Sequence, residues 1–294
     1  MIGMRCRALF AALACAVTGV QAGPTVPGAA PALQAQYATL RPRLEASPFG
    51  RRLLVESTES PRRLEGNIYA VIEYPYPTVS RLFTSPAVWC DVLILHLNVK
   101  QCRVTGAGPR PRLAVAIGRK VEQPVADAFP FEFAFSATAA DADALEVSLE
   151  APRGPIGTRD YRIVLTATAV DARHTFVHLR YAYGFGIEGR MAMRAYLATG
   201  GRGKVGFTLK GQSPDGAPLY IDDVRGATER NAMRYYLALD AYLGALGVPS
   251  AQQPTERFAR WFDGTERYRT QLHEVERETY LQMKRAEYAR QQHP

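Results

Sequence analysis

The most constraining feature of this chain is a series of short apolar stretches with the two-residue alternation of β-strands, followed by one long helical stretch. The alternating stretches are residues 67–74, 131–135, 145–149, 161–167 and 175–185. The helical stretch, residues 228–246, repeats apolar residues at i, i+3, i+4 and i+7 and so forms one stripe. A curved antiparallel sheet packed on such a helix usually leaves a cavity. The pattern therefore predicts an α+β fold with space for an apolar molecule.

The segments between these stretches are consistent with antiparallel pairing. No helical crossover separates the strands between residues 145 and 185, which excludes a parallel α/β fold. Thr78 is the expected N-cap of a short helix. Residues 47–63, which carry charge and Pro, are predicted to be irregular. The other predicted elements are helices over 33–44, 78–83, 86–91 and 191–198 and strands over 93–99, 112–118 and 204–209.

The first 22 residues have the features of a signal peptide. Arg5 and Arg7 precede an apolar stretch that is too short to span a membrane, and Val20-Gln21-Ala22 provides a small-x-small cleavage site. We expect cleavage after Ala22 and export to the bacterial periplasm. The alternatives are an uncleaved anchor and a lipoprotein anchored at Cys15, because Ala12-Leu13-Ala14-Cys15 resembles a lipobox.

The mature chain divides by composition into three parts. Residues 23–63 are expected to be a partly disordered lead-in, and residues 64–250 the main domain. Residues 251–294 are expected to form a highly charged amphipathic helical tail, either packed on the domain by a thin apolar stripe or bound to a membrane surface or partner protein.

Two cysteines, Cys90 and Cys102, remain in the mature chain. In an oxidising compartment such a pair can form a disulfide, and two buried free thiols are the alternative. The net charge of +8 is mildly basic, which suits an anionic membrane surface as well as an ordinary exported protein. Dense Lys/Arg clusters interleaved with aromatic residues do not occur in the sequence, so nucleic acid is not an expected partner.

Two patterns that can indicate cofactor or metal sites are present, but each is in an unsuitable context. Gly201-x-Gly203-x-x-Gly206 follows a predicted helix and precedes a strand, the reverse of a dinucleotide-binding loop. His174 and His178 are four residues apart, but they lie across a turn and a strand and lack a third ligand. The sequence has no Gly-x-Ser-x-Gly nucleophile motif. We therefore expect no cofactor, no metal and no catalysis.

The order of elements resembles the helix-grip fold shared by lipid-transfer START domains, polyketide cyclases and the birch-pollen-allergen family. The resemblance rests on residues 68–83 followed by Trp89-Cys90-Asp91, on the strands over 145–185, and on the helix over 228–246. It covers about two-thirds of the mature chain. The helix over 191–198 and the charged tail depart from the family pattern. The resemblance implies an apolar ligand, such as a lipid, held between the sheet and the long helix.

Aromatic residues on the sheet and helix faces are the candidate lining of that cavity, because each buried Tyr hydroxyl needs a partner. The candidate ligand-binding residues are Trp89, Phe133, Phe135, Tyr161, Tyr181, Tyr183, Met193, Tyr235, Tyr236 and Leu239. The leading hypothesis is non-catalytic binding or transfer of a hydrophobic, lipid-like ligand. The alternatives are a cyclase or aromatase type of enzyme and an envelope interaction module that acts through the C-terminal tail.

Overall fold

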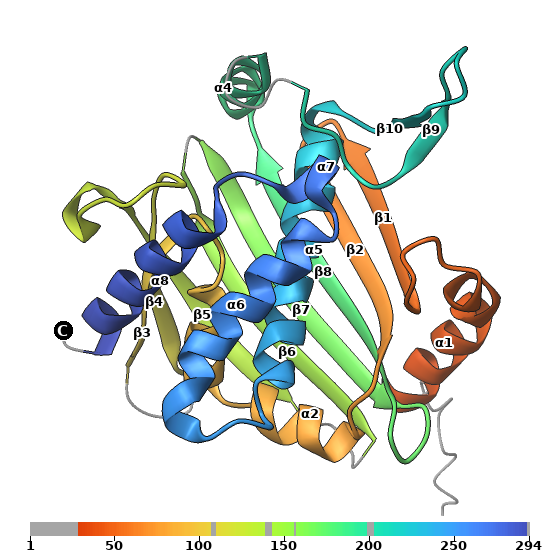
Figure 1. Cartoon of the computed structure of the whole chain (residues 1–294), viewed down its shortest axis with the longest axis horizontal. Coiled ribbons are helices and arrows are strands. Elements are labelled where there is room, and N and C mark those ends of the chain that lie inside the picture. Colours follow the sequence, from red (N-terminus) through yellow and green to blue (C-terminus); the bar gives the residue numbers. More distant parts are fainter. Residues whose placement is uncertain (1–28, 107–109, 139–142, 156, 199–202, 293–294) are drawn as a thin grey trace, which may run out of the picture.

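The computed structural model describes residues 29–106, 110–138, 143–155, 157–198 and 203–292. The expected signal peptide, residues 1–22, lies outside the described residues. One eight-stranded antiparallel sheet has the order β1-β2-β8-β7-β6-β5-β4-β3, and β9 and β10 form a separate hairpin (Figure 1). The strands are β1 (Leu53–Ser60), β2 (Arg63–Ile72), β3 (Val99–Thr105), β4 (Arg112–Ile117), β5 (Phe129–Thr138), β6 (Ala144–Arg153), β7 (Thr158–Ala169), β8 (Thr175–Phe185), β9 (Leu209–Gln212) and β10 (Pro218–Tyr220).

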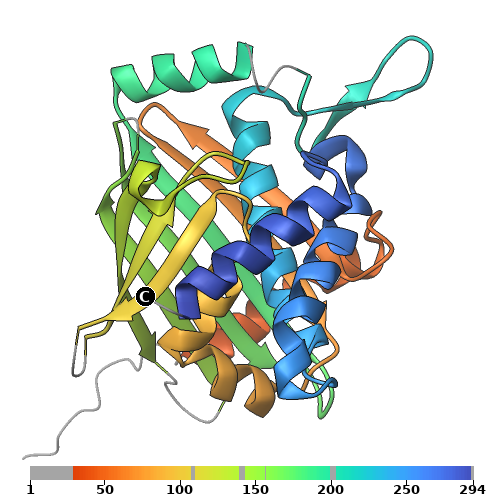
Figure 2. The same ribbon diagram turned by 60° about the vertical axis from the view of Figure 1, so that its left-hand side comes forward.

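The sheet curves around the long helix α5, and two C-terminal helices complete this layer (Figures 1 and 2). α6 packs along α5, and α8 packs on β3 at the sheet edge. The α+β class and the helix-grip arrangement expected from the sequence are confirmed. The helices are α1 (Ala29–Glu45), α2 (Tyr76–Phe83), α3 (Pro86–Leu93), α4 (Ile187–Ala198), α5 (Asp223–Gly244), α6 (Gln253–Glu266), α7 (Arg269–Leu272) and α8 (Arg277–Gln292).

The chain crosses from one side of the sheet to the other through α2 and α3. β2 pairs with β1 and β8, whereas the next strand in sequence, β3, lies at the opposite edge beside β4. The two short helices between them close one end of the space between sheet and α5. Gly66 of β2 allows α5 to approach closely, because a Cβ there would lie 3.1 Å from the Cβ of Ala232. The sheet and α5 are therefore in close contact at β2.

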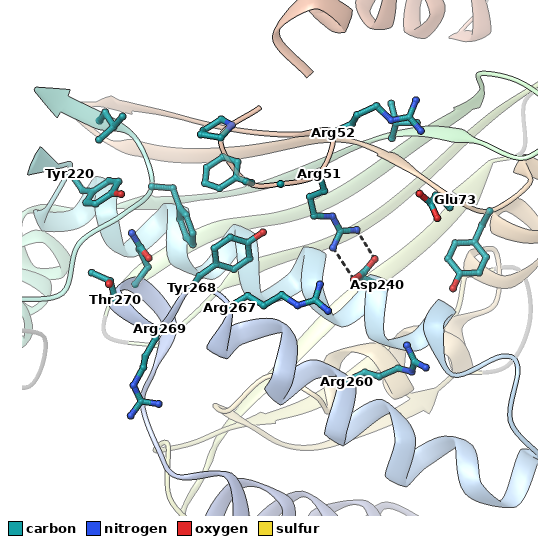
Figure 3. Close-up of a pocket in the computed structure, with 18 residues that line it drawn as sticks. Arg51, Arg52, Glu73, Tyr220, Asp240, Arg260, Arg267, Tyr268, Arg269 and Thr270 are labelled. Carbon is teal, nitrogen blue, oxygen red and sulfur yellow. Dashed lines mark hydrogen bonds and ion pairs between the residues drawn. The ribbon is translucent and has the colours of Figure 1, made fainter. Parts of the chain in front are cut away.

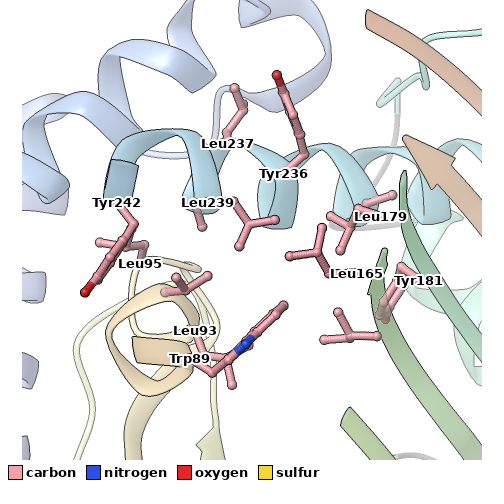
Figure 4. Packing of buried hydrophobic residues seen from close by; sticks show 14 of the residues in the cluster. Trp89, Leu93, Leu95, Leu165, Leu179, Tyr181, Tyr236, Leu237, Leu239 and Tyr242 are labelled. Carbon is pink, nitrogen blue, oxygen red and sulfur yellow. The ribbon is translucent and has the colours of Figure 1, made fainter. Parts of the chain in front are cut away.

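The two faces of the sheet bury different clusters, as the alternation of side chains in strands requires. Leu53, Ile68 and Leu179 belong to the large core beneath α5. Leu54, Tyr69 and Phe176, whose side chains point to the other face, form a smaller cluster there with Leu44 of α1. Figure 4 shows the large core, in which Trp89 and Leu93 of α3 face the same interior as Leu165, Leu179 and Leu239.

The predicted strand over 93–99 is wrong. α3 continues to Leu93, a turn follows, and β3 begins only at Val99. The five residues from Leu93 to Leu97 are all buried, so the apparent alternation does not separate a buried face from an exposed one. A short apolar run of this kind is compatible with either a strand or a buried helix end. Here Pro86 at the helix start favours the helix.

Three further local predictions need correction. Residues 47–63 are not irregular throughout, because they include β1, which pairs with β2. β1 is an edge strand whose polar residues are exposed, so its sequence lacks a clear apolar pattern. The strand predicted over 204–209 is wrong: β9 begins only at Leu209, and its four residues are all exposed. Thr78 does not cap α2, whose N-cap is Pro75. The sheet thus starts before residue 64.

The C-terminal segment consists of separate helices that share the main core, rather than one helix packed by a thin stripe. Trp261 of α6 and Tyr280 of α8 are almost fully buried, and their rings stack with centroids 4.9 Å apart. Glu287 of α8 accepts hydrogen bonds from the ammonium groups of Lys100 on β3 and Lys284 on α8, at 2.8 and 2.7 Å. All three side chains are fully buried, so this ion cluster ties α8 to the sheet edge.

A disulfide joins Cys90 of α3 to Cys102 of β3, with 5.1 Å between the Cα atoms. This is the pairing that the sequence suggested, and it links the crossover to the edge strand. Among the helices in the described part of the chain, none is long and apolar enough to cross a membrane.

Candidate functional site

A cavity of about 160 Å³ lies between α5 and the half of the sheet formed by β4, β5, β7 and β8. Its position is the one that the helix-grip fold predicts. Its volume is below the roughly 300–1,000 Å³ that is usual for small-molecule pockets, so it is too small for a lipid. We call it the tyrosine cavity; it is lined by His96, Asn98, Ile117, Phe131, Phe133, Pro155, Tyr161, Tyr181, Asn231 and Tyr235.

Four of the predicted ligand-binding residues meet in this cavity. Phe133 comes from β5, Tyr161 from β7, Tyr181 from β8 and Tyr235 from α5. The rings of Tyr181 and Tyr235 approach within 5.4 Å, centroid to centroid, and so connect the sheet to the helix at the cavity wall. The structure thus brings together aromatic side chains that the sequence had placed on separate strands and on the long helix.

The other predicted residues lie elsewhere. Trp89 is buried in the core, where its indole N–H donates to the carbonyl of Phe83, and Phe135 is also a core residue. Tyr236 and Leu239 border a void of only about 10 Å³ nearer β2. Successive residues on a helix point about 100° apart, so Tyr235 can face the cavity only if Tyr236 does not.

Tyr183 and Met193 form a second layer behind the cavity wall. The ring of Tyr183 stacks on Tyr161 with centroids 5.2 Å apart, and its hydroxyl lies 3.4 Å from the sulfur of Met193. Tyr183 therefore holds the Tyr161 ring in place without lining the cavity itself.

His96 and Asn231 are polar lining residues that the sequence did not identify. The ring of His96 packs on Tyr235, and its Nδ1 accepts a hydrogen bond from the backbone N–H of Asn98 at 3.2 Å. Asn231, one turn before Tyr235 on α5, lies beside both His96 and Tyr181. The wrongly predicted strand over 93–99 placed His96 on the face opposite Leu93, Leu95 and Leu97, which explains why its role was missed.

The His96 side chain is neutral at physiological pH and presents a hydrogen-bond donor. Burial, reinforced by the positive charges of Arg234, Lys284 and Lys120, lowers its pKa well below the ordinary value. Because Nδ1 is an acceptor, the proton of the neutral ring is on Nε2. Within the described part of the chain this buried Nε2 has no partner at hydrogen-bonding distance, although the side chain of Asn231 lies close enough to oppose part of the pKa shift. His96 therefore brings an N–H donor without a close partner to the lining of the cavity.

The tyrosine hydroxyls around the cavity keep their protons. Burial raises the pKa of Tyr181 well above the ordinary value, and neighbouring tyrosines add to this effect. Burial likewise raises the pKa of Tyr161 and Tyr235. The hydroxyl of Tyr161 lies 3.0 Å from the hydroxyl of Thr158, which fixes its position. The lining is thus mainly aromatic, with a few neutral polar groups.

The histidine and glycine patterns have structural roles where the structure describes them. His178 bonds to the amide oxygen of Asn67 at 2.7 Å, and His174 pairs with Asp171. No group of three His, Cys, Asp or Glu that could hold a metal occurs among the described residues. Gly201 lies outside the described residues. Gly206 makes room for the buried carboxylate of Glu229, since a Cβ there would lie 2.5 Å from one carboxylate oxygen.

Comparison with known proteins gives similarities of structure only. No protein-family model and no curated protein sequence matches the chain. Norcoclaurine synthase from Thalictrum flavum has a TM-score of 0.34 at 10% identity, over 63% of this chain and 91% of that one. Human StAR-related lipid transfer protein 5 has a TM-score of 0.32 at 7% identity, over 57% and 89%. A conserved protein of unknown function from Enterococcus faecalis has a TM-score of 0.31 at 11% identity, over 71% and 96%.

Proposed function

We propose that this protein is exported and binds, without transforming it, a small aromatic molecule with one hydrogen-bond acceptor in the tyrosine cavity. The observation that carries the proposal is the buried, unsatisfied Nε2–H of His96. A buried donor without a partner costs about 1–3 kcal/mol. A ligand oxygen at this position would recover that energy, while its ring would contact the aromatic lining.

The size of the cavity limits the ligand to a single ring with a small substituent. Its volume of about 160 Å³ resembles that of engineered apolar cavities of roughly 150 Å³ that bind benzene. A lipid or sterol would require the sheet and α5 to separate. The proposed ligand is therefore smaller than the one that the family resemblance implied.

Binding without chemistry fits the protonation of the lining groups. A general acid or base works best when its pKa is near the operating pH. The pKa of His96 lies well below that range and that of Tyr181 well above it. These groups are suited to holding a neutral ligand through hydrogen bonds.

Export is proposed from the leader-like residues 1–22, and the Cys90–Cys102 disulfide supports it because disulfides persist in oxidising compartments. Intact-mass measurement of the protein from a periplasmic fraction should give a chain that begins at Gly23. A full-length mass in the cytoplasmic fraction would contradict export.

The binding proposal can be tested with two probes of similar shape. Acetophenone carries a carbonyl acceptor, and ethylbenzene lacks it. We expect ligand-observed NMR on the mature chain to show tighter binding of acetophenone, and the preference should disappear in His96→Phe, which keeps a ring against Tyr235 but loses the N–H donor. Ile117→Phe, which fills the cavity, should abolish binding of both probes.

Equal affinities for the two probes in the wild-type protein, or binding that persists in Ile117→Phe, would refute the proposed site. Native mass spectrometry of the protein from its host would show a small bound molecule if the site is occupied there. If that molecule were converted during incubation, the protein would be an enzyme, and the proposal of binding without chemistry would be wrong.

A further inference from the structure

A second and larger hollow lies on the outer side of α5, away from the tyrosine cavity. It has a volume of about 940 Å³ and lies between the loop at residues 48–52, the end of β2, the β9–β10 hairpin, and α6 and α7 (Figure 3). It shares no lining residue with the tyrosine cavity. We call this hollow the arginine cleft, because five arginines line it: Arg51, Arg52, Arg260, Arg267 and Arg269.

The charges in the arginine cleft are not balanced. Only two carboxylates, Glu73 and Asp240, are among its lining residues. Asp240 accepts two hydrogen bonds from Arg51, at 2.8 and 3.0 Å, so its charge is already neutralised. Within the described ranges, Arg52 and Arg267 have no carboxylate within ion-pair distance. Arg260 and Arg269 pair with Glu256 and Glu266, so the excess positive charge of the cleft lies on Arg52 and Arg267.

Arg51 is held in a fixed position at the centre of the cleft. Burial alone would lower its pKa, but the hydrogen bonds to Asp240 raise it above the ordinary value, so the guanidinium stays charged. The Cζ atom of Arg51 also lies 5.2 Å from the centre of the Tyr236 ring. In Figure 3 the side chains of Arg267 and Arg260, from the end and the middle of α6, are directed towards the space next to this pair.

One wall of the arginine cleft is aromatic. Phe49, Phe207 and Tyr268 contact one another edge to face, with centroid distances between 5.5 and 5.9 Å. Leu209, which is 58% exposed, and Tyr220 extend this wall onto the hairpin. The cationic groups and the apolar side chains thus line the same hollow.

We propose that the arginine cleft binds an organic anion whose phosphate or carboxylate contacts Arg267, next to the Arg51–Asp240 pair, and whose apolar part lies on Phe49, Phe207 and Leu209. Guanidinium groups suit this role because their planar donors match phosphate and carboxylate oxygens in pairs. Such an anion occurs both in soluble phosphate esters and in lipid headgroups, and the cleft is wide enough to admit either. This site is independent of the ligand proposed for the tyrosine cavity.

The test uses the mature chain with inorganic phosphate, hexyl phosphate, and vesicles of phosphatidylcholine with or without phosphatidylglycerol. Isothermal titration should show hexyl phosphate binding several-fold more tightly than inorganic phosphate. Arg267→Gln should weaken hexyl phosphate binding about tenfold. Arg153→Gln, which removes an exposed arginine from β6, is the matched control and should bind like the wild type.

A second pair of variants tests the apolar wall. Leu209→Ser should weaken binding of hexyl phosphate but not of inorganic phosphate. Leu219→Ser, on the same hairpin and 46% exposed but outside the cleft lining, should change neither. Binding to phosphatidylglycerol vesicles that Arg267→Gln abolishes would identify a lipid headgroup as the source of the anion. Binding of hexyl phosphate alone would identify a soluble ester.

The proposal would be overturned if hexyl phosphate did not bind at millimolar concentration. It would equally be overturned if Arg267→Gln and Arg153→Gln weakened binding of hexyl phosphate or anionic vesicles to the same extent, because the effect would then reflect net charge alone. Circular dichroism on each variant confirms that these exposed substitutions leave the fold intact.

Discussion

The imidazole of His96 and the phenol ring of Tyr235 lie nearly parallel, with centroids 5.0 Å apart and planes inclined by 25°. His96 follows α3, and Tyr235 belongs to α5, so the contact joins the crossover to the long helix. It forms one side of the tyrosine cavity and sets its size. The Tyr235 ring therefore limits which ligands can enter.

Replacing Tyr235 by Ala should enlarge the tyrosine cavity and change its selectivity. We expect 2-acetylnaphthalene to bind Tyr235→Ala but not the wild type, because a second ring needs the volume that the phenol occupies. Tyr235→Phe keeps the ring and should retain the wild-type selectivity. NMR titration of each variant with acetophenone and 2-acetylnaphthalene measures the affinity for both ketones. Binding of the larger ketone to Tyr235→Phe would contradict this account.

Reducing the disulfide between Cys90 and Cys102 should destabilise the protein by about 2–3 kcal/mol, because the bond closes a short loop in the unfolded chain. Urea unfolding of the wild type with and without dithiothreitol measures the loss. The double variant Cys90→Ala/Cys102→Ala should show a comparable loss and no further response to the reductant. A response of the double variant to dithiothreitol would show that the effect does not come from this bond.

Removing Glu287 should be much more damaging than removing an exposed glutamate of the same helix. In Glu287→Gln two buried ammonium groups, Lys100 and Lys284, lose their counter-charge, for an expected loss of about 3–5 kcal/mol. The control Glu278→Gln affects a solvent-exposed contact of 3.9 Å and should change stability by less than about 1 kcal/mol. Similar midpoints of urea unfolding for the two variants would refute the structural role of the buried cluster.

The sequence predicted the elements whose patterns depend on local contacts. The strand over 175–185 coincides with β8, because its alternating residues lie between a turn at 171–173 and the helix α4. The long stripe over 228–246 likewise corresponds to most of α5. Where both faces of a segment are buried, as at 93–97, alternation of side chains does not distinguish a strand from a buried helix end, and the predicted strand was wrong.

The sites depend on contacts that no local pattern contains. The sequence predicted both Tyr235 and Tyr236 as ligand-binding residues. Only the orientation of α5 about its own axis places Tyr235 in the tyrosine cavity and Tyr236 beneath Arg51. Arg51 and Arg267 belong to segments far apart in the sequence. The packing of α6 on α5, and of α5 on β1 and β2, brings both to the arginine cleft. Fold class was therefore predictable and cavity membership only partly so.

The stability of the protein should decrease as the pH falls from about 6.5 to about 4 because of His178. Burial, with a smaller effect of Arg180, lowers the pKa of His178 in the folded state from 6.5 to about 4. Between these values the unfolded chain takes up a proton that the folded protein does not, so acid favours unfolding. Above pH 6.5 both states are neutral, and below pH 4 both are protonated, so the linkage is confined to this window.

The variant His178→Gln should flatten this part of the pH profile. Urea unfolding at intervals between pH 4 and pH 7.5 gives the free energy of unfolding for both proteins, and their difference isolates His178 from other groups, including the buried His96. We expect the difference to change by on the order of 2–3 kcal/mol across the window. Parallel profiles would mean that His178 titrates alike in the folded and unfolded states, and that its bond to Asn67 does not exclude the charged ring.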